Sequence, residues 1–113
     1  RSQDRAFVAG LLNSHTVHVA RTPVVEGFLA HRAGEVDALY VSAGARRRGI
    51  GSALLAAARV GAGPLSLWTF QANDAALRFY AAQGFVEAER SDGARNDERL
   101  PDVRLVENRR DGR

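Results

Sequence analysis

Cysteine, lysine and methionine are all absent from the 113 residues of this chain. Without cysteine there is no disulfide framework and no thiolate metal site. Without lysine there is no Schiff-base chemistry, and the phosphate-binding loop that ends in Gly-Lys-Ser/Thr is excluded as well. The missing methionine at position 1 predicts that the natural start lies upstream or was removed.

Long apolar runs are missing too. No stretch approaches the ~20 apolar residues that cross a bilayer, and residues 1–5 do not have the pattern of a secretory signal. We therefore expect a cytoplasmic protein without a membrane partner. The histidines His15, His18 and His31 lack the spacing of metal ligands, so they are expected on the surface and no metal is expected.

The charge is nearly balanced, with 16 basic residues, all of them arginine, against 13 acidic residues and a net charge of +3. This small excess is weak evidence for a nucleic-acid partner, and none is expected. Apolar residues make up 45% and charged residues 26%, which is ordinary for a folded protein. The length predicts one domain over residues 1–113.

The first third of the chain predicts a short helix that ends near residues 6–12, with Asn13-Ser14 as its exit. Alternating valines then predict strands, and Thr22-Pro23 predicts a turn. The strands are expected over 16–21, 24–31 and 35–41, the last two joined as a hairpin by Arg32-Ala33-Gly34.

The remainder predicts two helices among further strands. Ile50, Leu54, Leu55 and Ala58 share one face of a helix over 52–60. Asn73-Asp74 is typical of an N-cap and Gly84 of a helix C-terminus. The other expected elements are strands over 65–70, 85–89 and 101–107, a helix over 75–83, a polar loop over 91–100 and a frayed charged tail over 108–113. This order predicts an α/β protein with a mixed sheet and helices on both faces.

The segment between the third strand and the next helix reads Arg46-Arg47-Arg48-Gly49-Ile50-Gly51. Glycines let several backbone N–H groups point at one spot, and the helix N-terminus adds free donors and a positive dipole end. Together these features bind phosphate, and arginines supply permanent charge. Taken alone, the segment fits a solvated basic turn that caps a helix better than a phosphate site.

A second motif strengthens the phosphate interpretation. Asn73, Ala76, Phe79-Tyr80 and Gly84-Phe85 follow the loop in order, and Leu39-Tyr40-Val41 precedes it. Over residues 24–106 this pattern resembles the GNAT superfamily of acyl-CoA-dependent N-acyltransferases. The resemblance implies a central mixed sheet with two splayed strands. It also implies that this chain lacks room for the family's first strand and helix.

The resemblance assigns roles to particular residues. The pyrophosphate of the acetyl-CoA co-substrate would lie on the N–H groups from Arg47 to Ser52, and its pantetheine arm beside Leu39, Tyr40 and Val41. Tyr80 would be the general acid. Together the implied cofactor-binding residues are Leu39, Tyr40, Val41, Arg46, Arg47, Arg48, Gly49, Ile50, Gly51, Ser52, Asn73 and Tyr80.

The chemistry of acyl transfer explains these choices. A free amine attacks the thioester directly, and a phenol with a pKa near ~10 can protonate a departing thiolate with a pKa of about 8.5. For the general base we favour Glu35 or Asp37, over Glu26, His15 and His18. Each residue also has a plainer interpretation: Tyr80 as a core tyrosine, Asn73 as an N-cap, Glu35 and Asp37 as solvated strand residues, and Trp68 and Phe70 as core or slot lining.

Three functions are consistent with the sequence. The first is an N-acetyltransferase that moves an acetyl group from acetyl-CoA to a primary amine on a small molecule or peptide. The second is a non-catalytic acyl-CoA-binding regulatory module, and the third is a basic nucleic-acid-binding domain. The sequence does not name the acceptor amine. A homodimer is expected because an exposed sheet edge would favour pairing.

Overall fold

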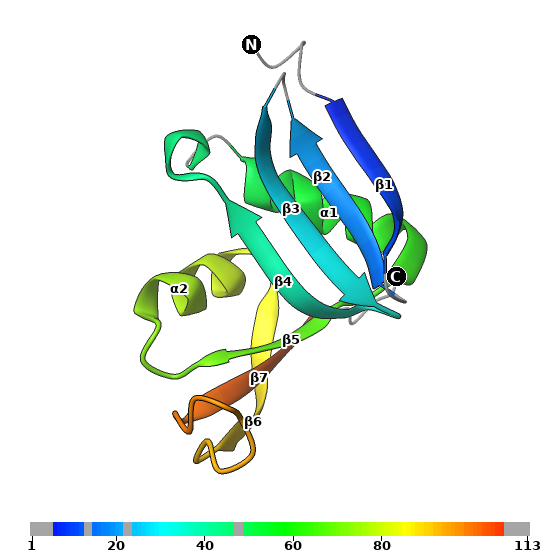
Figure 1. Cartoon of the computed structure of the whole chain (residues 1–113). Coiled ribbons are helices and arrows are strands. Elements are labelled where there is room, and N and C mark those ends of the chain that lie inside the picture. The colour runs from blue at the N-terminus through cyan, green and yellow to red at the C-terminus, as the bar shows by residue number, and fades with distance from the viewer. Residues whose placement is uncertain (1–5, 13–14, 22–23, 47–48, 108–113) are drawn as a thin grey trace. The chain divides into compact units, whose positions relative to one another are not determined.

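The computed structural model describes residues 6–12, 15–21, 24–46 and 49–107. The chain divides into two compact units, Arg1–Gly63 and Pro64–Arg113. We describe each unit by itself. Both units combine strands with one α-helix, so the predicted α/β class is confirmed (Figure 1).

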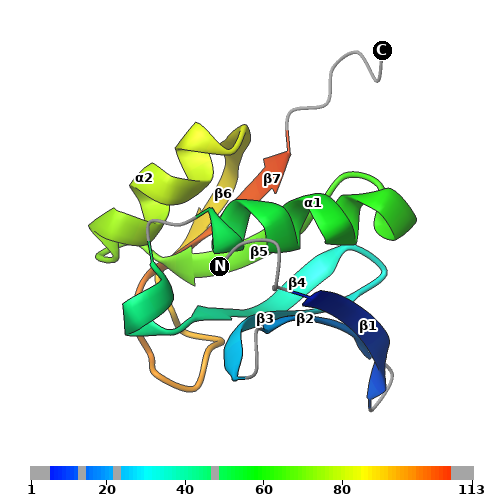
Figure 2. The same cartoon turned by 90° about the horizontal axis from the view of Figure 1, so that it is seen from above.

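The first unit is an antiparallel sheet with a helix on one face. The strands pair in chain order, and α1 packs across β2, β3 and β4, as Figure 2 shows. Leu54, Leu55 and Ala58 are fully buried on the predicted face of the helix. The elements are β1 (Ala6–Leu12), β2 (His15–Arg21), β3 (Val25–Arg32), β4 (Glu35–Val41), the short 3₁₀ helix η2 (Ala43–Ala45) and α1 (Ile50–Ala62).

The predicted helix near residues 6–12 is wrong, because these residues form β1. All seven pair with β2 without a shift of register, from Ala6 opposite Arg21 to Leu12 opposite His15. Gly10 in the middle of the segment lowers its helix propensity, and pairing to a neighbouring strand then decides the conformation. The predicted exit Asn13-Ser14 and the predicted turn Thr22-Pro23 lie outside the described residues.

The predicted hairpin between β3 and β4 is confirmed, and it contains an irregularity that the sequence did not reveal. Ala30 pairs with Ala38 and His31 with Val36, so Asp37 is an extra residue in β4. Such a β-bulge bends a strand and re-aims a side chain. The bulge therefore sets the direction of Asp37, one of the two predicted general bases.

Close contact between α1 and the sheet depends on Gly27 in β3. A Cβ atom at this position would lie 2.6 Å from the backbone oxygen of Tyr40 and 3.3 Å from Cγ2 of Ile50. Ile50 is the first residue of α1 and is buried. The missing side chain at residue 27 thus allows the helix N-terminus to lie directly on β3.

The second unit contains a three-stranded antiparallel sheet in which β7 lies between β5 and β6. Leu67, Val103 and Leu105 form one buried face, together with Phe85. The elements are β5 (Ser66–Phe70), α2 (Asp74–Ala82), β6 (Phe85–Ser91) and β7 (Asp102–Glu107). Each was predicted to within two residues at either end. The predicted tail over 108–113 lies outside the described residues.

Candidate functional site

The loop that leads into α1 is held by its own backbone and by one arginine. After β4 the chain makes the turn of η2, and Arg46 Nε donates a hydrogen bond to the Val41 carbonyl at 3.2 Å. Gly49 then precedes α1 with a φ of 77°, a left-handed conformation that favours glycine. Arg46 is exposed, so its guanidinium is fixed at the loop and open to solvent. Arg47 and Arg48 lie outside the described residues.

The first turn of α1 is suited to an anion. Gly49 provides no side-chain cap, and the first turn, which lies wholly within the described residues, has no acidic side chain. The first helical hydrogen bond runs from Ala53 N–H to the Gly49 carbonyl at 2.9 Å. The N–H groups of Ile50, Gly51 and Ser52 precede it, at the positive end of the helix dipole.

The predicted bases on β4 have different surroundings. Asp37 is exposed at the bulge, and its Oδ2 lies 2.5 Å from Nε2 of His15 on β2. Glu35 is half-buried and has an interaction of its own. The structure therefore joins Asp37 to a histidine 22 positions away, a contact that requires the register of three strands and has no local sequence signal.

His18 and His31 depart from the predicted surface location. Their rings stack at 5.5 Å with an interplanar angle of 12°, and His31 is buried, accepting a hydrogen bond at Nδ1 from the Gly34 N–H. Burial lowers the pKa of both imidazoles; repulsion from His31 adds to the effect at His18, and repulsion from His15 adds to it at His31. Within the described residues, no group of three or more histidine and acidic side chains is arranged to hold a metal ion.

Tyr80 and Asn73 lie at opposite ends of α2 in the second unit. Asn73 Oδ1 accepts a hydrogen bond from the Ala76 N–H at 3.1 Å, so the predicted N-cap is confirmed. Tyr80 is half-buried and makes T-shaped contacts with two aromatic rings, Phe79 at a centroid distance of 5.1 Å and Phe85 at 5.3 Å. This burial raises the pKa of the Tyr80 phenol, which keeps the group protonated at neutral pH.

Trp68, predicted to be core or slot lining, is 39% exposed and lines a cavity of about 610 Å³ in the second unit. The other lining residues come from β6, from the start of β7 and from the loop between them. The sequence indicated only that this loop is polar. No motif in it predicted a cavity, because the cavity depends on how the loop folds back over β5.

A comparison with known protein families shows to which family this chain belongs. The family described as an acetyltransferase (GNAT) domain matches residues 13–87, a span that includes both the arginine-glycine loop and Tyr80. The chain belongs to the GNAT acetyltransferase family. The resemblance drawn from the two motifs is thereby confirmed.

Solved structures agree with the GNAT assignment. Apo YjaB from Escherichia coli is 26% identical, with a TM-score of 0.72 over 80% of this chain and 63% of that one. An acetyl-CoA-bound GNAT acetyltransferase from Elizabethkingia anophelis is 13% identical, with a TM-score of 0.79 over 92% of this chain and 97% of that one. The ribosomal-protein-S18-alanine N-acetyltransferase of E. coli is 20% identical, with a TM-score of 0.69 over 86% and 70% of the two chains.

The chain thus spans less than two thirds of the YjaB chain, while it covers nearly all of the E. anophelis chain. A search of the curated proteins found no match. In the described part of the chain, neither α-helix has the length and apolar character that crossing a membrane requires.

The predicted site residues of the GNAT chain fall into two groups. Leu39, Tyr40 and Val41 belong to the first unit, as do Glu35, Asp37, Arg46 and residues 49–52, whereas Asn73 and Tyr80 belong to the second. Leu39 pairs with Leu29 in the register of β3 and β4, and Tyr40 with Phe28. The predicted slot between splayed strands, and the predicted loss of the family's first strand and helix, stay predictions.

Proposed function

We propose that this GNAT chain transfers an acetyl group from acetyl-CoA to a primary amine by direct attack of the amine on the thioester. The observation that carries the proposal is the loop and first turn at the start of α1, within the span that matches the family. The acetyl-CoA bound to the similar E. anophelis protein supports the choice of co-substrate. We also propose that the protein acts in the cytoplasm.

The diphosphate of the co-substrate would bind at the first turn of α1, where no acidic side chain competes for the backbone N–H donors. Ile50, Gly51 and Ser52 supply N–H groups at the start of the helix, and Arg46 supplies a charge already anchored through its Nε to Val41. Arg47 and Arg48 are proposed to add phosphate contacts. A diphosphate carries the negative charge that the positive end of the helix dipole favours.

The acyl-transfer step needs an acid for the leaving thiolate and a base for the amine. We assign the acid to Tyr80, because burial raises the pKa of its phenol and so keeps the proton available. The base is assigned to Asp37, which is exposed at the bulge and held by His15, with Glu35 on the same strand as the alternative. A backbone N–H near Val41 would stabilise the oxyanion.

The experiment that tests this function has two stages. Saturating acetyl-CoA, at 100 times its dissociation constant, should stabilise the folded protein by about 2.7 kcal/mol. Release of free thiol with a panel of amines then separates an enzyme from a module that only binds acyl-CoA. Absence of both stabilisation and thiol release would contradict the proposal.

The assignment of the base has its own test. Asp37→Asn should lower kcat by 10²-fold or more if its carboxylate takes the amine proton, and Glu35→Gln should then have an effect within threefold. The opposite ranking would transfer the role to Glu35. Binding of acetyl-CoA should be unchanged in both variants, because neither residue belongs to the proposed phosphate site.

We further propose a homodimer formed through β1. Among the strands that the structure describes, β1 pairs only with β2, and its sequence from Ala6 to Leu12 contains no charged residue. Phe7, Val8, Leu11 and Leu12 are 45%, 49%, 80% and 64% exposed. An uncharged apolar edge pairs readily with an antiparallel copy of itself. Light scattering should give the mass of a dimer, and that of a monomer for Leu11→Lys; a monomeric parent chain would contradict this proposal.

A further inference from the structure

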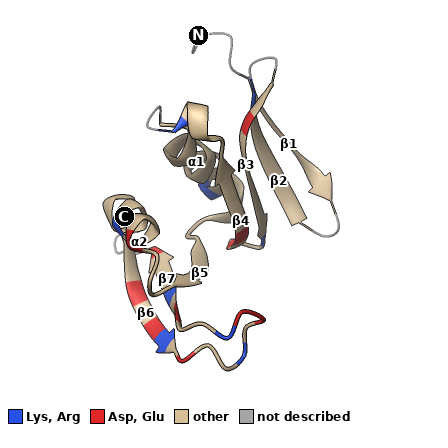
Figure 3. Ribbon diagram, turned by 60° about the vertical axis from the view of Figure 1, so that its left-hand side comes forward, with Lys and Arg blue, Asp and Glu red and all other residues tan. Residues whose placement is uncertain are grey.

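One face of the sheet in the second unit carries polar side chains and the only tryptophan of the chain. Trp68 pairs with Arg104, which pairs with Glu89, so these three side chains share a face. The buried face, with Leu67, Val103 and Leu105, is the opposite one. Figure 3 shows the acidic residues along β6 and in the loop that follows it.

The cavity of about 610 Å³ lies on this polar face. Its floor includes Trp68 on β5 and Glu89 on β6. The remaining wall includes Asp92, Arg95, Asn96 and Asp102. Three carboxylates and one guanidinium line this space, and Arg104 lies on the same face between Trp68 and Glu89. The carboxylates therefore still outnumber the arginines, which leaves an excess of negative charge beside an aromatic ring.

The wall of the cavity is fixed by hydrogen bonds. Asn96 Nδ2 donates to the Leu100 carbonyl at 2.8 Å, and the Leu100 N–H donates back to Asn96 Oδ1 at 3.2 Å. A Cβ atom at Gly93 would lie 2.3 Å from the Leu100 carbonyl oxygen, so the loop closes against a residue without a side chain. The loop is thus already folded around the cavity and needs little reorganisation to hold a ligand.

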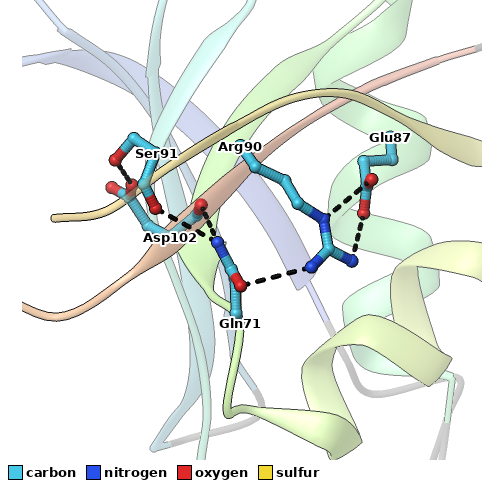
Figure 4. A network of polar contacts seen from close by, with 5 residues as sticks. All are labelled: Gln71, Glu87, Arg90, Ser91 and Asp102. Carbon is cyan, nitrogen blue, oxygen red and sulfur yellow. Dashed lines mark hydrogen bonds and ion pairs between the residues drawn. The ribbon is translucent and has the colours of Figure 1, made fainter.

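The ends of β6 and β7 are fixed in the same way. Gln71 Nε2 donates to the backbone carbonyls of Ser91 and Asp102 at 3.1 and 2.9 Å, and Gln71 Oε1 accepts from Arg90 at 3.2 Å (Figure 4). The ion pair of Arg90 with Glu87 completes this network. These contacts position Ser91 and Asp102 at the cavity.

Two of the carboxylates are held by neutral donors. Asp102 accepts hydrogen bonds from the Ser91 hydroxyl and from Asn96 Nδ2, and Asp92 Oδ1 accepts one from the Ala94 N–H at 2.9 Å. Donors without charge orient a carboxylate and leave its negative charge in place. A cation that enters the cavity would meet these charges together with the indole ring of Trp68, an aromatic system that attracts cations.

We propose that this cavity binds an organic cation with two or more ammonium groups, and that such a polyamine is the acceptor of the enzyme. The second part rests on the proposed acetyl transfer, whereas the first does not. Three carboxylates against Arg95 and Arg104 favour a cation. Because the carboxylates come from β6, from the following loop and from β7, they offer separate positions for more than one ammonium group. The volume of about 610 Å³ leaves room for the carbon chain between the ammonium groups.

Trp68 provides the readout for binding, because it is the only tryptophan in the sequence and lines the cavity. Its fluorescence is followed while spermidine is added to the full chain without coenzyme. We expect a saturable change whose midpoint rises with salt and lies at least tenfold lower for spermidine than for butylamine. No change, or the same midpoint for both amines, would overturn the proposal.

Matched variants separate the cavity from general surface charge. Glu89→Gln combined with Asp92→Asn should raise the spermidine midpoint about tenfold, because it removes two charges and keeps the hydrogen-bonding shape. Asp97→Asn changes an exposed loop acid that does not line the cavity, and should alter the midpoint less than twofold. Equal effects of the two changes would overturn the site.

The acceptor assignment is tested with the same variants. Glu89→Gln with Asp92→Asn should raise the KM for spermidine about tenfold and leave the KM for acetyl-CoA unchanged. Spermidine binding without thiol release from acetyl-CoA would support the cavity and remove the acceptor role. A third outcome is possible: thiol is released with other amines, spermidine does not change the Trp68 fluorescence, and the KM for spermidine is unchanged in the double variant. That outcome would refute the cavity as a cation site and leave the proposed acetyl transfer unaffected.

Discussion

The candidate residues of the two units differ in kind. In the first unit, the backbone N–H groups at the start of α1 and the Arg46 side chain anchored to Val41 are proposed to bind phosphate. Asp37 on β4 is the proposed base of the same unit. The second unit offers side chains, with Tyr80 between two aromatic rings and Trp68 beside acidic residues. We expect a site made of backbone groups to tolerate most side-chain changes, whereas one substitution can remove the chemistry of a side chain such as the Tyr80 phenol.

The largest effect is expected at Tyr80. Tyr80→Phe removes the proposed acid and should lower kcat by 10²–10⁴-fold, while the affinity for acetyl-CoA changes less than twofold. Phe79→Leu is the control, because it changes a neighbouring ring and leaves the phenol in place. Thiol release and coenzyme binding are measured in parallel, and an equal loss in both for Tyr80→Phe would break the contrast between the two units.

The pH profile sharpens the same assignment. Burial raises the pKa of Tyr80 above its usual value of 10.0, so the proposed acid stays protonated between pH 7 and 9. The rate should therefore rise with pH from 7 to 9 as the free amine accumulates, without a falling limb in that range. A falling limb below pH 9 that Tyr80→Phe removes would mean that the phenol has a lowered pKa.

The next effect concerns the contact that seats α1 on the sheet. Gly27→Ala brings a methyl group to within 2.6 Å of the Tyr40 backbone oxygen, and should destabilise the protein by about 1–3 kcal/mol. Gly10→Ala is the matched control in β1, since nothing lies within 4 Å of a Cβ atom there. Urea unfolding of both variants measures the difference; equal stabilities would show that the backbone of β4 and Ile50 do not approach Gly27 as described.

A smaller effect is expected from the anchored arginine. Arg46→Ala should weaken acetyl-CoA binding about tenfold, since a charge-assisted hydrogen bond contributes ~1.5–3 kcal/mol, and should leave kcat at saturation within twofold. Arg21→Ala removes another exposed arginine of the same unit as a control. Calorimetric titration of both variants with acetyl-CoA gives the comparison, and equal weakening by the two would show that only overall charge matters.

The smallest effect concerns acid stability. The pKa of His18 and of His31 is lowered in the folded chain, chiefly by burial, so the unfolded chain takes up protons first as the pH falls. Stability should therefore be lost from about pH 6.5 downward, toward the lowered folded pKa values. His18→Phe keeps a ring for stacking and should flatten the dependence of Tm on pH between 7 and 5. An unchanged dependence of Tm on pH would show that His18 and His31 do not determine the loss of stability in acid.

The contrast between the units also shows what the sequence could predict. The loop before α1 could be linked to the GNAT family from the sequence, because glycines and arginines at fixed spacing reflect a backbone requirement. The strand at residues 6–12 could not be predicted, because Gly10 and the apolar residues around it fit both a helix and a strand. Pairing with β2 decides between the two conformations. Likewise the contact of His15 with Asp37, the stacking of His18 on His31 and the cavity at Trp68 all join residues distant in sequence. Strand register and loop closure create them, and neither has a local pattern.

Amide NMR of the full chain during addition of coenzyme A tests the central claim most directly. If the start of α1 binds the diphosphate, the amide resonances of Gly49, Ile50, Gly51 and Ser52 should shift together and saturably. The amides of β1, which takes no part in the proposed site, should stay in place. Saturable shifts elsewhere with these four resonances unmoved, or no shifts at all, would contradict the account.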